Sequence, residues 1–176
     1  MAGHNKWSKI KNKKATSDAQ KSKQFSKLSR LITVEVKKAG GDRDDPCVRK
    51  AIEKAKSVNM PNENIEKAVK RAQQSDIQNM ESVVYEFYGP EGVAVIIEGL
   101  TDNRNRTAAE IKSILNRNGM ELAQPGSASW AFEKTDEGYK STTSVKISEE
   151  AKEKLSSVLN ELEESVDIQA IYNNAE

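Results

Sequence analysis

Apolar residues in the first part of the chain recur with the 3.6-residue period of amphipathic helices, in three successive stretches. The stripes are Phe25, Leu28, Leu31, Ile32 and Val36 in the first stretch, Val48, Ala51, Ile52 and Ala55 in the second, and Ile65, Ala68, Val69 and Ala72 in the third. This pattern predicts three short helices that share one core, the third of them beginning near Pro61. Because the core residues are small, we expect this part to have modest stability by itself.

Two of the predicted helices carry start signals. Ser17, followed three residues later by Gln20, is a capping box, and the helix behind it is expected to run to about Lys38. Asp45 is expected to cap the second helix. Pro46 then occupies the first turn, where the N–H that proline lacks has no partner within the helix.

After residues 73–82, which lose the helical period and are interpreted as a linker, the pattern becomes that of strands. Apolar and polar residues alternate over residues 83–87. The Gly-Pro-Glu-Gly sequence at residues 89–92 suits a reversal, and residues 93–97 form an apolar run without alternation. We therefore expect a hairpin whose second strand is central in its sheet.

A polar segment and a helix follow this central strand. Thr107 with Glu110 is a second capping box, so the helix is expected to start at Thr107 and to end at Gly119. The apolar side of this helix is predicted to consist of Ala108, Ile111 and Leu115.

The rest of the chain predicts two strands, a helix and a last strand. Ser148, followed by Glu149 and Glu150, is expected to cap the helix. The alternating or periodic positions are Ala128, Trp130 and Phe132 in the first strand, Thr143, Val145 and Ile147 in the second, Ala151, Leu155, Val158, Leu159 and Leu162 in the helix, and Val166, Ile168, Ala170 and Tyr172 in the last strand.

The order of elements predicts the fold class. From Val93 onward, the order strand, helix, strand, strand, helix, strand is that of ferredoxin-like sandwiches, with one extra strand in front. The predicted class is α+β: an N-terminal three-helix domain, followed by a ferredoxin-like α/β sandwich with an extra N-terminal strand. We place the domains at residues 1–80 and 81–176, and expect two helices on one face of an open sheet.

Charge is divided unequally between these two predicted domains, although the net charge of the chain is only +1. Residues 1–80 carry 19 Lys+Arg and 9 Asp+Glu, whereas residues 81–176 carry 9 Lys+Arg and 18 Asp+Glu. A basic half beside an acidic half suggests that a polyanion binds the first half and is repelled by the second.

Composition excludes several classes of protein. Cys47 is the single cysteine and His4 the single histidine, so an internal disulfide, a cysteine metal cluster, a two-histidine zinc motif and a histidine-containing catalytic triad are excluded. No stretch approaches the roughly 20 apolar residues of a membrane-spanning helix, and the N-terminus lacks the apolar region of a secretion signal. We expect a cytoplasmic protein with no membrane partner, small-molecule substrate, metal or cofactor.

The first 15 residues form a basic arm with one large aromatic residue. Trp7 is surrounded by lysines in a segment that cannot bury enough apolar surface to fold alone. This composition suits a nucleic-acid contact in which lysines meet phosphates and the indole stacks on a base or sugar. The alternative is that Trp7 docks on the following helices while the lysines are only solvated. The candidate residues are Lys6, Trp7, Lys9, Lys11, Lys13 and Lys14 of the arm, continued by Lys21, Lys23, Lys27 and Arg30 on the first helix.

A second candidate site is the polar corner at residues 101–106. Arg104 and Arg106 lie among short hydrogen-bonding side chains just before a predicted helix N-terminus, an arrangement suited to an anion. The alternatives are a solvated corner whose arginines pair with nearby carboxylates, or a fastening between the two domains.

Several long motifs resemble the YebC/PmpR family, which includes a mitochondrial translational activator of cytochrome oxidase. They are MAGHNKWSKIKNKK, GGDRDDPCVRKAIEKAKSVNMPNENIEKA, YGPEGVAVIIEGLTDNRNRTAAEI and PGSASWAF. The resemblance covers most of residues 1–133 and resumes in the last helix and strand. It implies a non-enzymatic regulator of gene expression. It places the family's basic motif on the arm residues given above and its arginine corner on Asp102, Asn103, Arg104, Asn105 and Arg106.

The chain departs from the family pattern in one respect. The resemblance implies a third domain inserted between the strand ending near Phe132 and the strand near Thr143, where this chain has only residues 133–142. A connection between two strands tolerates such a change because the strands themselves are unaltered. The resemblance therefore implies for this chain only the functions that do not depend on the third domain.

Four functions remain open from the sequence. We prefer a translation factor or activator that acts on the ribosome or RNA and recognises ribosomal RNA or a messenger by its shape. The alternative is a DNA-binding transcriptional regulator, although the second and third helices show no row of base-reading side chains. An enzyme using Glu98 and Asp102 to bind magnesium is disfavoured because no second cluster supports it. An adaptor whose acidic half contacts a basic protein is compatible with the first function.

Overall fold

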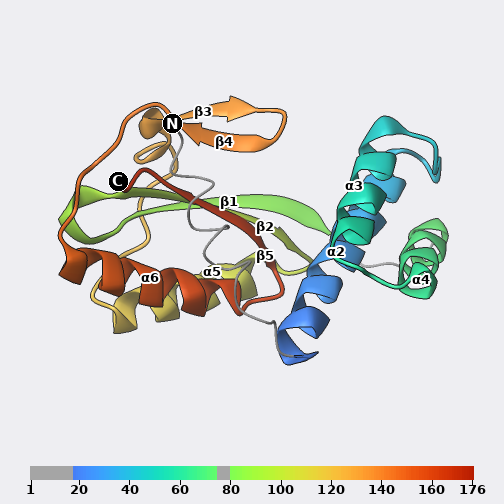
Figure 1. Ribbon diagram of the computed structural model, residues 1–176, viewed down its shortest axis with the longest axis horizontal. Coiled ribbons are helices and arrows are strands. Elements are labelled where there is room, and N and C mark those ends of the chain that lie inside the picture. Colours follow the sequence, from blue (N-terminus) through green and yellow to red (C-terminus); the bar gives the residue numbers. More distant parts are fainter. Residues whose placement is uncertain (1–17, 75–79) are drawn as a thin grey trace. The chain divides into compact units, whose positions relative to one another are not determined.

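The computed structural model describes residues 18–74 and 80–176, which fall into two compact units (Figure 1). The helical unit contains α2 (Asp18–Lys38), α3 (Pro46–Ser57) and α4 (Asn62–Gln73). The α/β unit contains the remaining strands and helices. Within the described ranges, every helix is too short or too polar to span a bilayer.

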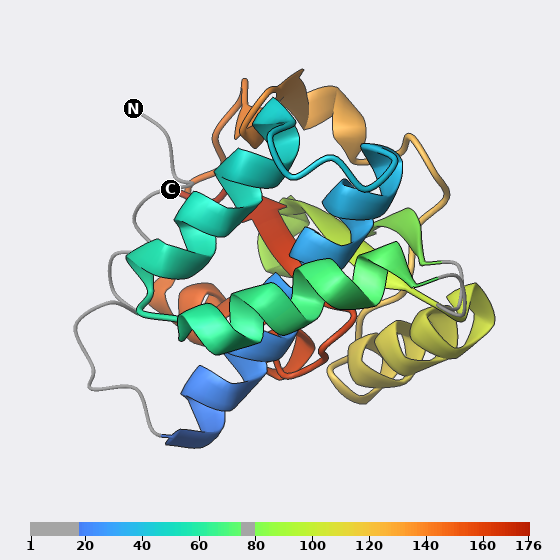
Figure 2. The same ribbon diagram turned by 90° about the vertical axis from the view of Figure 1, so that its right-hand side faces the viewer.

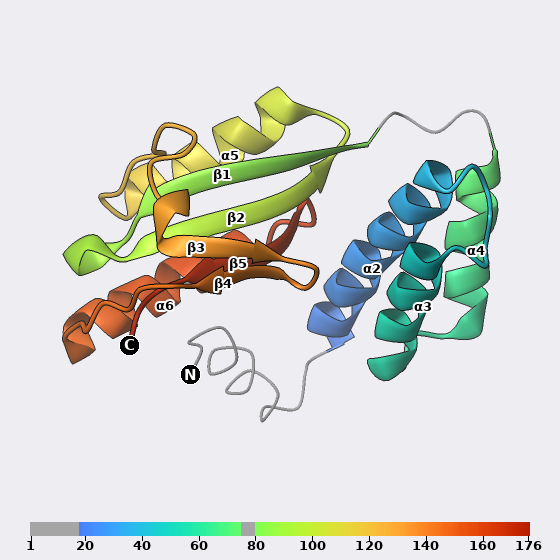
Figure 3. The ribbon, with the colours of Figure 1, turned by 90° about the horizontal axis from the view of Figure 1, so that it is seen from above.

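The helical unit is built around α2, along which both α3 and α4 pack (Figure 2). The three predicted apolar stripes form its core, with Phe25 and Leu31 partly buried at the edge and Met60 added from the loop before α4. α3 runs back along α2, so that the end of α3 lies toward the N-terminal half of α2 (Figures 1 and 3). The prediction of three helices with a shared core is confirmed.

Local signals define the helix starts in this unit. The Asp45 carboxylate accepts the N–H of Cys47 at 2.8 Å and Pro46 is the first helical residue, so the predicted cap is confirmed. α4 begins directly after Pro61, as expected. The capping box predicted at Ser17 lies outside the described residues.

The α/β unit contains a three-stranded sheet in the order β1 (Glu81–Tyr88), β2 (Ala94–Thr101), β5 (Ile168–Asn173). The turn between β1 and β2 is a short 3₁₀ segment, η1 (Pro90–Gly92), closed by the Gly89 N–H donating to the Val93 carbonyl at 2.8 Å. β2 is central and nearly every one of its residues is buried. The predicted hairpin and central strand are confirmed.

Both faces of the sheet are covered. α5 (Arg104–Arg117) and α6 (Glu149–Glu163) pack on one face, where Val95 and Ile97 of β2 meet Leu115 of α5 and Leu159 of α6 (Figures 1 and 3). The other face of β2 carries Ala94, which packs against the segment before β3. The α+β class, the two helices on one face and the Ser148 cap of α6 are confirmed.

The predicted ferredoxin-like sheet is wrong in one detail of its topology. β3 (Phe132–Thr135) and β4 (Gly138–Ser141) lie almost entirely within residues 133–142, which were expected only to connect two strands, and they pair with each other to form a separate hairpin. This hairpin contacts β5 through Tyr139, whose ring meets Tyr172 edge to face at 5.5 Å between centroids. It occupies the position where the family resemblance places an inserted domain.

Two predicted strands are also wrong. Ser129–Ala131 is a 3₁₀ turn, η2, in which Ala128 and Ala131 are buried while Trp130 is 62% exposed. Its alternation resembles that of a strand, but the burial arises from a turn that presses two small residues against β2. Residues 143–147 contribute a single bridge, between Val145 and Ala175, instead of a strand.

Candidate nucleic-acid interface

The basic arm cannot be placed from the structure. Its candidate residues lie outside the described part of the chain, so their role stays a prediction from the sequence. They are Lys6, Trp7, Lys9, Lys11, Lys13 and Lys14.

The predicted basic side of the first helix lies on the N-terminal half of α2. Lys21 is exposed, whereas Lys23, Lys27 and Arg30 are partly covered. Each of these three also interacts with another group of the chain. Three of these four cations of α2 are therefore partly buried and already interact within the chain, and Lys21 is the most exposed of them.

The exposed cations of α3 were missed by the sequence analysis. Arg49, Lys50, Lys54 and Lys56 are all exposed, on the half of the helix that does not carry the buried stripe, with Glu53 among them. Arg49 and Lys56 lie along one edge of this half and Lys54 along the other, because residues seven apart share a side of a helix and residues two apart do not. The same 3.6-residue period that marks the apolar stripe contains this signal, since it leaves these four cations on the remaining side.

Some other cations of the helical unit are paired with carboxylates. Arg43 forms a two-pronged pair with Glu66, with nitrogen–oxygen distances of 2.6 and 2.8 Å, and Lys67 pairs with Glu63 at 2.6 Å. The hydrogen bond to Glu66 raises the pKa of the Arg43 guanidinium. In contrast, within the part of the chain that the structure describes, the side chains of Arg49, Lys54 and Lys56 form no ion pair.

α5 begins within the arginine corner, about one turn earlier than predicted. Asn103 is the N-cap, and its side-chain oxygen accepts the Arg106 N–H at 3.0 Å. The prediction of a capping box at Thr107 and Glu110 is wrong: Thr107 is buried inside the helix, and the Glu110 carboxylate accepts a hydrogen bond from Ser165. Arg104 and Arg106 therefore lie in the first turn of α5.

A buried carboxylate organises this corner. The Asp167 side chain is only 3% exposed, and its Oδ2 accepts hydrogen bonds from the Thr107 hydroxyl at 2.8 Å, the Arg106 guanidinium at 2.9 Å and the Thr101 hydroxyl at 3.3 Å. Arg106 also pairs with Asp102 at 2.6 Å. The hydrogen bond to Asp167, followed by that to Asp102, raises the pKa of the Arg106 guanidinium.

These contacts give Arg106 a structural use within its own unit. It ties the start of α5 to the residues before β5, which lie about 60 positions later in the chain. Because two carboxylates already balance its charge, Arg106 is poorly placed to hold an external anion. The backbone carbonyl of Arg104 accepts the Tyr85 hydroxyl at 3.2 Å, and the Arg104 residue is exposed.

A second buried carboxylate explains the PGSASW motif, which sequence reasoning assigned to a strand. The side chain of Glu86, in β1, accepts the N–H groups of Gly126 at 2.8 Å, Ala128 at 2.7 Å and Ser129 at 2.8 Å. Tyr88 donates its hydroxyl to the Ser127 carbonyl and accepts the indole N–H of Trp130 at 2.9 Å. Hydrogen bonds to β1 therefore hold this loop in place. The bonded residues are about 40 positions apart in the sequence, so local patterns do not reveal the contact.

The two carboxylates considered for magnesium are engaged separately. Glu98 accepts the Tyr172 hydroxyl at 3.0 Å, and Asp102 pairs with Arg106. Burial, followed by the charge of Glu98, raises the pKa of the Tyr172 hydroxyl. No group of three or more His, Cys, Asp or Glu side chains suited to a metal occurs among residues 18–74 and 80–176.

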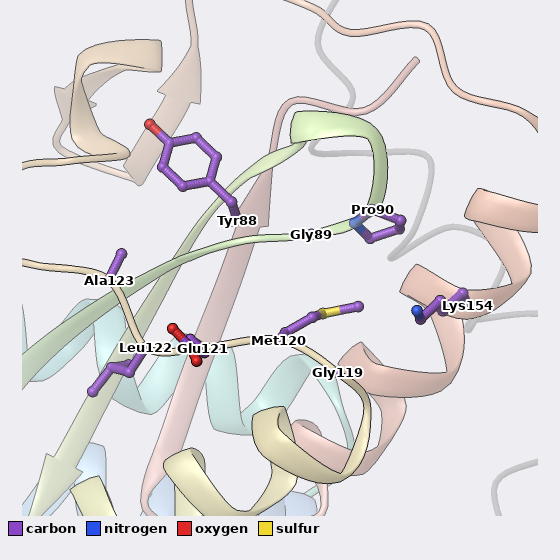
Figure 4. Close-up of a pocket in the computed structure, with 9 residues that line it drawn as sticks. All are labelled: Tyr88, Gly89, Pro90, Gly119, Met120, Glu121, Leu122, Ala123 and Lys154. Atoms are coloured by element: carbon purple, nitrogen blue, oxygen red, sulfur yellow. The ribbon is translucent and has the colours of Figure 1, made fainter.

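A shallow surface depression of about 400 Å³ lies at the end of the β1–β2 hairpin (Figure 4). Its lining mixes apolar and charged groups and lacks a converging set of polar side chains. The lining residues are Tyr88, Gly89, Pro90, Gly119, Met120, Glu121, Leu122, Ala123 and Lys154. It offers no arrangement suited to catalysis.

Comparison with known proteins identifies relatives of most of the chain. A model of the TACO1/YebC protein N-terminal domain matches residues 5–75, and a model of the TACO1/YebC second and third domain matches residues 80–139. The crystal structure of a conserved hypothetical protein, Aq1575 from Aquifex aeolicus, is 32% identical, with a TM-score of 0.84 and coverage of 95% of each chain.

Curated relatives carry the name "Probable transcriptional regulatory protein". The relative from Finegoldia magna is 52% identical over 136 residues, which are 76% of this chain and 56% of the relative. The relative from Halothermothrix orenii is 52% identical over 137 residues, 76% of this chain and 54% of the relative. The chain therefore spans about half the length of the curated relatives it matches. Since the two family models together match most of its residues, the chain belongs to the TACO1/YebC family.

Proposed function

We propose that this chain is a non-enzymatic regulator of gene expression that binds the sugar-phosphate backbone of a nucleic acid through its helical unit and the basic arm before it. The observation that carries the proposal is the division of charge. Residues 18–73 contain 14 Lys+Arg and 8 Asp+Glu, whereas residues 82–176 contain 9 Lys+Arg and 17 Asp+Glu. A polyanion is attracted to the first set and repelled by the second, which orients the contact.

The kind of cation suits backbone binding better than sequence readout. Apart from Arg49, the exposed cations of α3 are lysines, and a lysine meets a phosphate as a point charge. Contacts to phosphate supply affinity and position but carry little sequence information. We therefore expect binding that depends steeply on salt and weakly on sequence.

Two target polymers follow from two different observations. The names of the relatives favour DNA and a role in transcription, in preference to the translational role expected from the sequence alone. The lysine-rich surface without a row of base readers instead suits a folded RNA recognised by shape, as in a translation factor acting at the ribosome. We take DNA as the first target and RNA as the second.

Crosslinking in cells, followed by sequencing of the bound nucleic acid, separates the two targets. Enrichment of promoter DNA supports the transcriptional role, and enrichment of ribosomal or messenger RNA supports the translational role. Recovery of neither polymer above an uncrosslinked control contradicts the proposal.

The contribution of the arm has its own test. Replacing Lys9, Lys11, Lys13 and Lys14 by Ala removes up to four phosphate contacts. The slope of log K against log salt should then flatten by up to about 3.6 for duplex DNA or about 2.8 for a single strand. An unchanged slope shows that the arm lies outside the interface.

A further inference from the structure

We infer that the exposed ring of Trp130, with Tyr88 beside it, is a docking site for an arginine-containing basic segment of a partner protein. The site lies on the acidic α/β unit. The inference is therefore independent of the proposed function, which concerns the helical unit and the arm, and it adds a protein partner to the nucleic acid.

Trp130 is the most exposed large apolar residue in the part of the chain that the structure describes. It is 62% exposed, compared with 44% for Val84 and 38% for Tyr88. Its neighbours Ala128 and Ala131 are buried against β2. The turn at η2 therefore places two small side chains inward and its largest ring in solvent. Tryptophan is one of the residue types enriched among the residues that dominate protein–protein binding.

The indole ring is held in place although it is exposed. The buried Glu86 carboxylate fixes the backbone just before it, through the N–H groups of Ala128 and Ser129. The indole N–H donates to the Tyr88 hydroxyl at 2.9 Å, and this hydroxyl donates to the Ser127 carbonyl. A ring that is fixed before binding loses little conformational entropy when a ligand packs on it.

These hydrogen bonds leave the faces of the ring for recognition. The indole N–H is the one hydrogen-bond donor of a tryptophan side chain, and Tyr88 already accepts it. The ring still offers the negative potential over its face, which attracts a cation more strongly for tryptophan than for tyrosine or phenylalanine. A planar guanidinium also stacks on such a face, so arginine is the side chain that fits it best.

The surrounding charge favours a basic protein segment over a nucleobase. Residues 121–141, the segment that carries Trp130, contain four acidic and two basic residues, and residues 82–176 contain 17 Asp+Glu and 9 Lys+Arg. One of the two basic residues of the segment, Lys134, lies over the Tyr139 ring. A nucleobase also stacks on an indole, but this net negative charge repels the phosphates attached to the base.

A purely structural role for Trp130 does not account for its exposure. Bracing of the loop requires only the indole N–H, which the Tyr88 hydroxyl accepts. The backbone of the loop is in any case held by Glu86, and Tyr88 reaches the Ser127 carbonyl directly. Neither contact requires the faces of a large apolar ring to stay in water, whereas docking of a partner does.

The test is a titration of the full chain into two labelled peptides, followed by fluorescence anisotropy. One peptide alternates arginine with glycine, and the other has lysine in place of each arginine. The variants are Trp130→Ala, Trp130→Phe and a matched control, Val84→Ala, which truncates another exposed apolar residue of the same unit. Circular dichroism and melting temperature verify that each variant is folded.

The unchanged chain is expected to bind the arginine peptide more tightly than the lysine peptide. Trp130→Ala should weaken binding of the arginine peptide by about 5- to 30-fold and remove this preference, because the cation–π contact and its packing are lost. Trp130→Phe should keep part of the preference, and Val84→Ala should keep all of it. The inference is wrong if the unchanged chain does not distinguish the peptides, or if Trp130→Ala binds the arginine peptide as the unchanged chain does.

A second measurement leaves Trp130 unaltered. In the Trp7→Phe variant, Trp130 is the single tryptophan, so tryptophan emission reports on its ring. A saturating amount of unlabelled arginine peptide should change this emission, and unchanged emission overturns the inference.

Two further results identify a different occupant and also overturn it. The first is weaker binding of single-stranded RNA by Trp130→Ala with unchanged peptide binding, which assigns the ring to base stacking. The second is self-association of the unchanged chain that Trp130→Ala abolishes in sedimentation, which assigns the ring to a contact between copies. In all these outcomes, the salt dependence of nucleic-acid binding by the unchanged chain tests the proposed function separately.

Discussion

The cations of the helical unit and Arg106 of the α/β unit are similar in exposure but differ in what surrounds them. Arg106 is half exposed, yet it lies against the buried carboxylate of Asp167 and pairs with Asp102. Arg49, Lys54 and Lys56 of α3 form no ion pair among the described residues, although the charge of Lys56 acts on the nearby Glu66 carboxylate. The comparison teaches that an exposed cation can have a structural role when a buried carboxylate supplies its counter-charge.

The α/β unit should therefore lose stability when a buried carboxylate is altered, and binding should be unaffected. The largest effect is expected for Glu86→Gln, because an amide cannot accept all three N–H groups of the loop at residues 126–129. We expect a loss of about 2–4 kcal/mol in the free energy of unfolding, measured by urea denaturation. The exposed control Glu121→Gln should change it by less than about 0.5 kcal/mol. Equal losses in the two variants would contradict the role given to Glu86.

A smaller effect is expected for Arg106→Gln. The substitution leaves the buried Asp167 carboxylate with its two threonine hydroxyls but without its cation. Since Arg106 is half exposed and solvent weakens its ion pairs, we expect a loss of about 1–2 kcal/mol. The salt dependence of nucleic-acid binding should stay the same. A flattened slope without loss of stability would place Arg106 in the interface instead.

Arg104 lies in the same turn of α5 as Arg106 and serves as its comparison. Arg104→Ala should change the free energy of unfolding by less than about 0.5 kcal/mol. If Arg104 contacts one phosphate, the slope of log K against log salt should flatten by about 0.7–0.9. Denaturation and anisotropy measured on the same preparation decide between the two roles, and a large loss of stability would assign Arg104 to the fold.

The smallest effects concern the pH dependence of stability, to which exposed carboxylates with a lowered pKa contribute in each unit. Hydrogen bonds from the Ser148 side chain and then its backbone N–H lower the pKa of Glu91, and the hydrogen bond from Arg43 lowers the pKa of Glu66. Because both pKa values are below the ordinary 4.5, these contacts stabilise the fold above that pH and are lost as pH falls through the lowered values.

Melting temperature measured between neutral pH and about pH 3 tests this expectation. Glu91→Gln should weaken the acid dependence of the α/β unit, and Glu66→Gln that of the helical unit. Identical acid profiles for both variants and the unchanged chain would show that neither contact contributes.

The features that the sequence predicted are those encoded locally. The stripes of α2, α3 and α4, the Asp45 cap and the Ser148 cap depend on residues within one or two turns of each other. The start of α5 was missed because Thr107 with Glu110 matches a capping box, while Asn103 is the actual cap. The Thr107 hydroxyl is instead bound to Asp167, 60 residues away, and no local pattern shows that contact.

The same limit applies to the sheet and to the candidate interface. The separation of the β3–β4 hairpin from the main sheet depends on long-range packing, including that of Tyr139 on Tyr172. The exposed cations of α3 were accessible in principle, since they follow from the helical period once the buried stripe is known.

The central claim is that the basic helical side of this chain meets a sugar-phosphate polymer. Fluorescence anisotropy of the full chain with duplex DNA and with single-stranded RNA, over a series of salt concentrations, tests it most directly. The account predicts binding to at least one polymer that weakens steeply and linearly in log K against log salt. Absence of binding to both polymers in dilute buffer, or binding that does not change with salt, would contradict it.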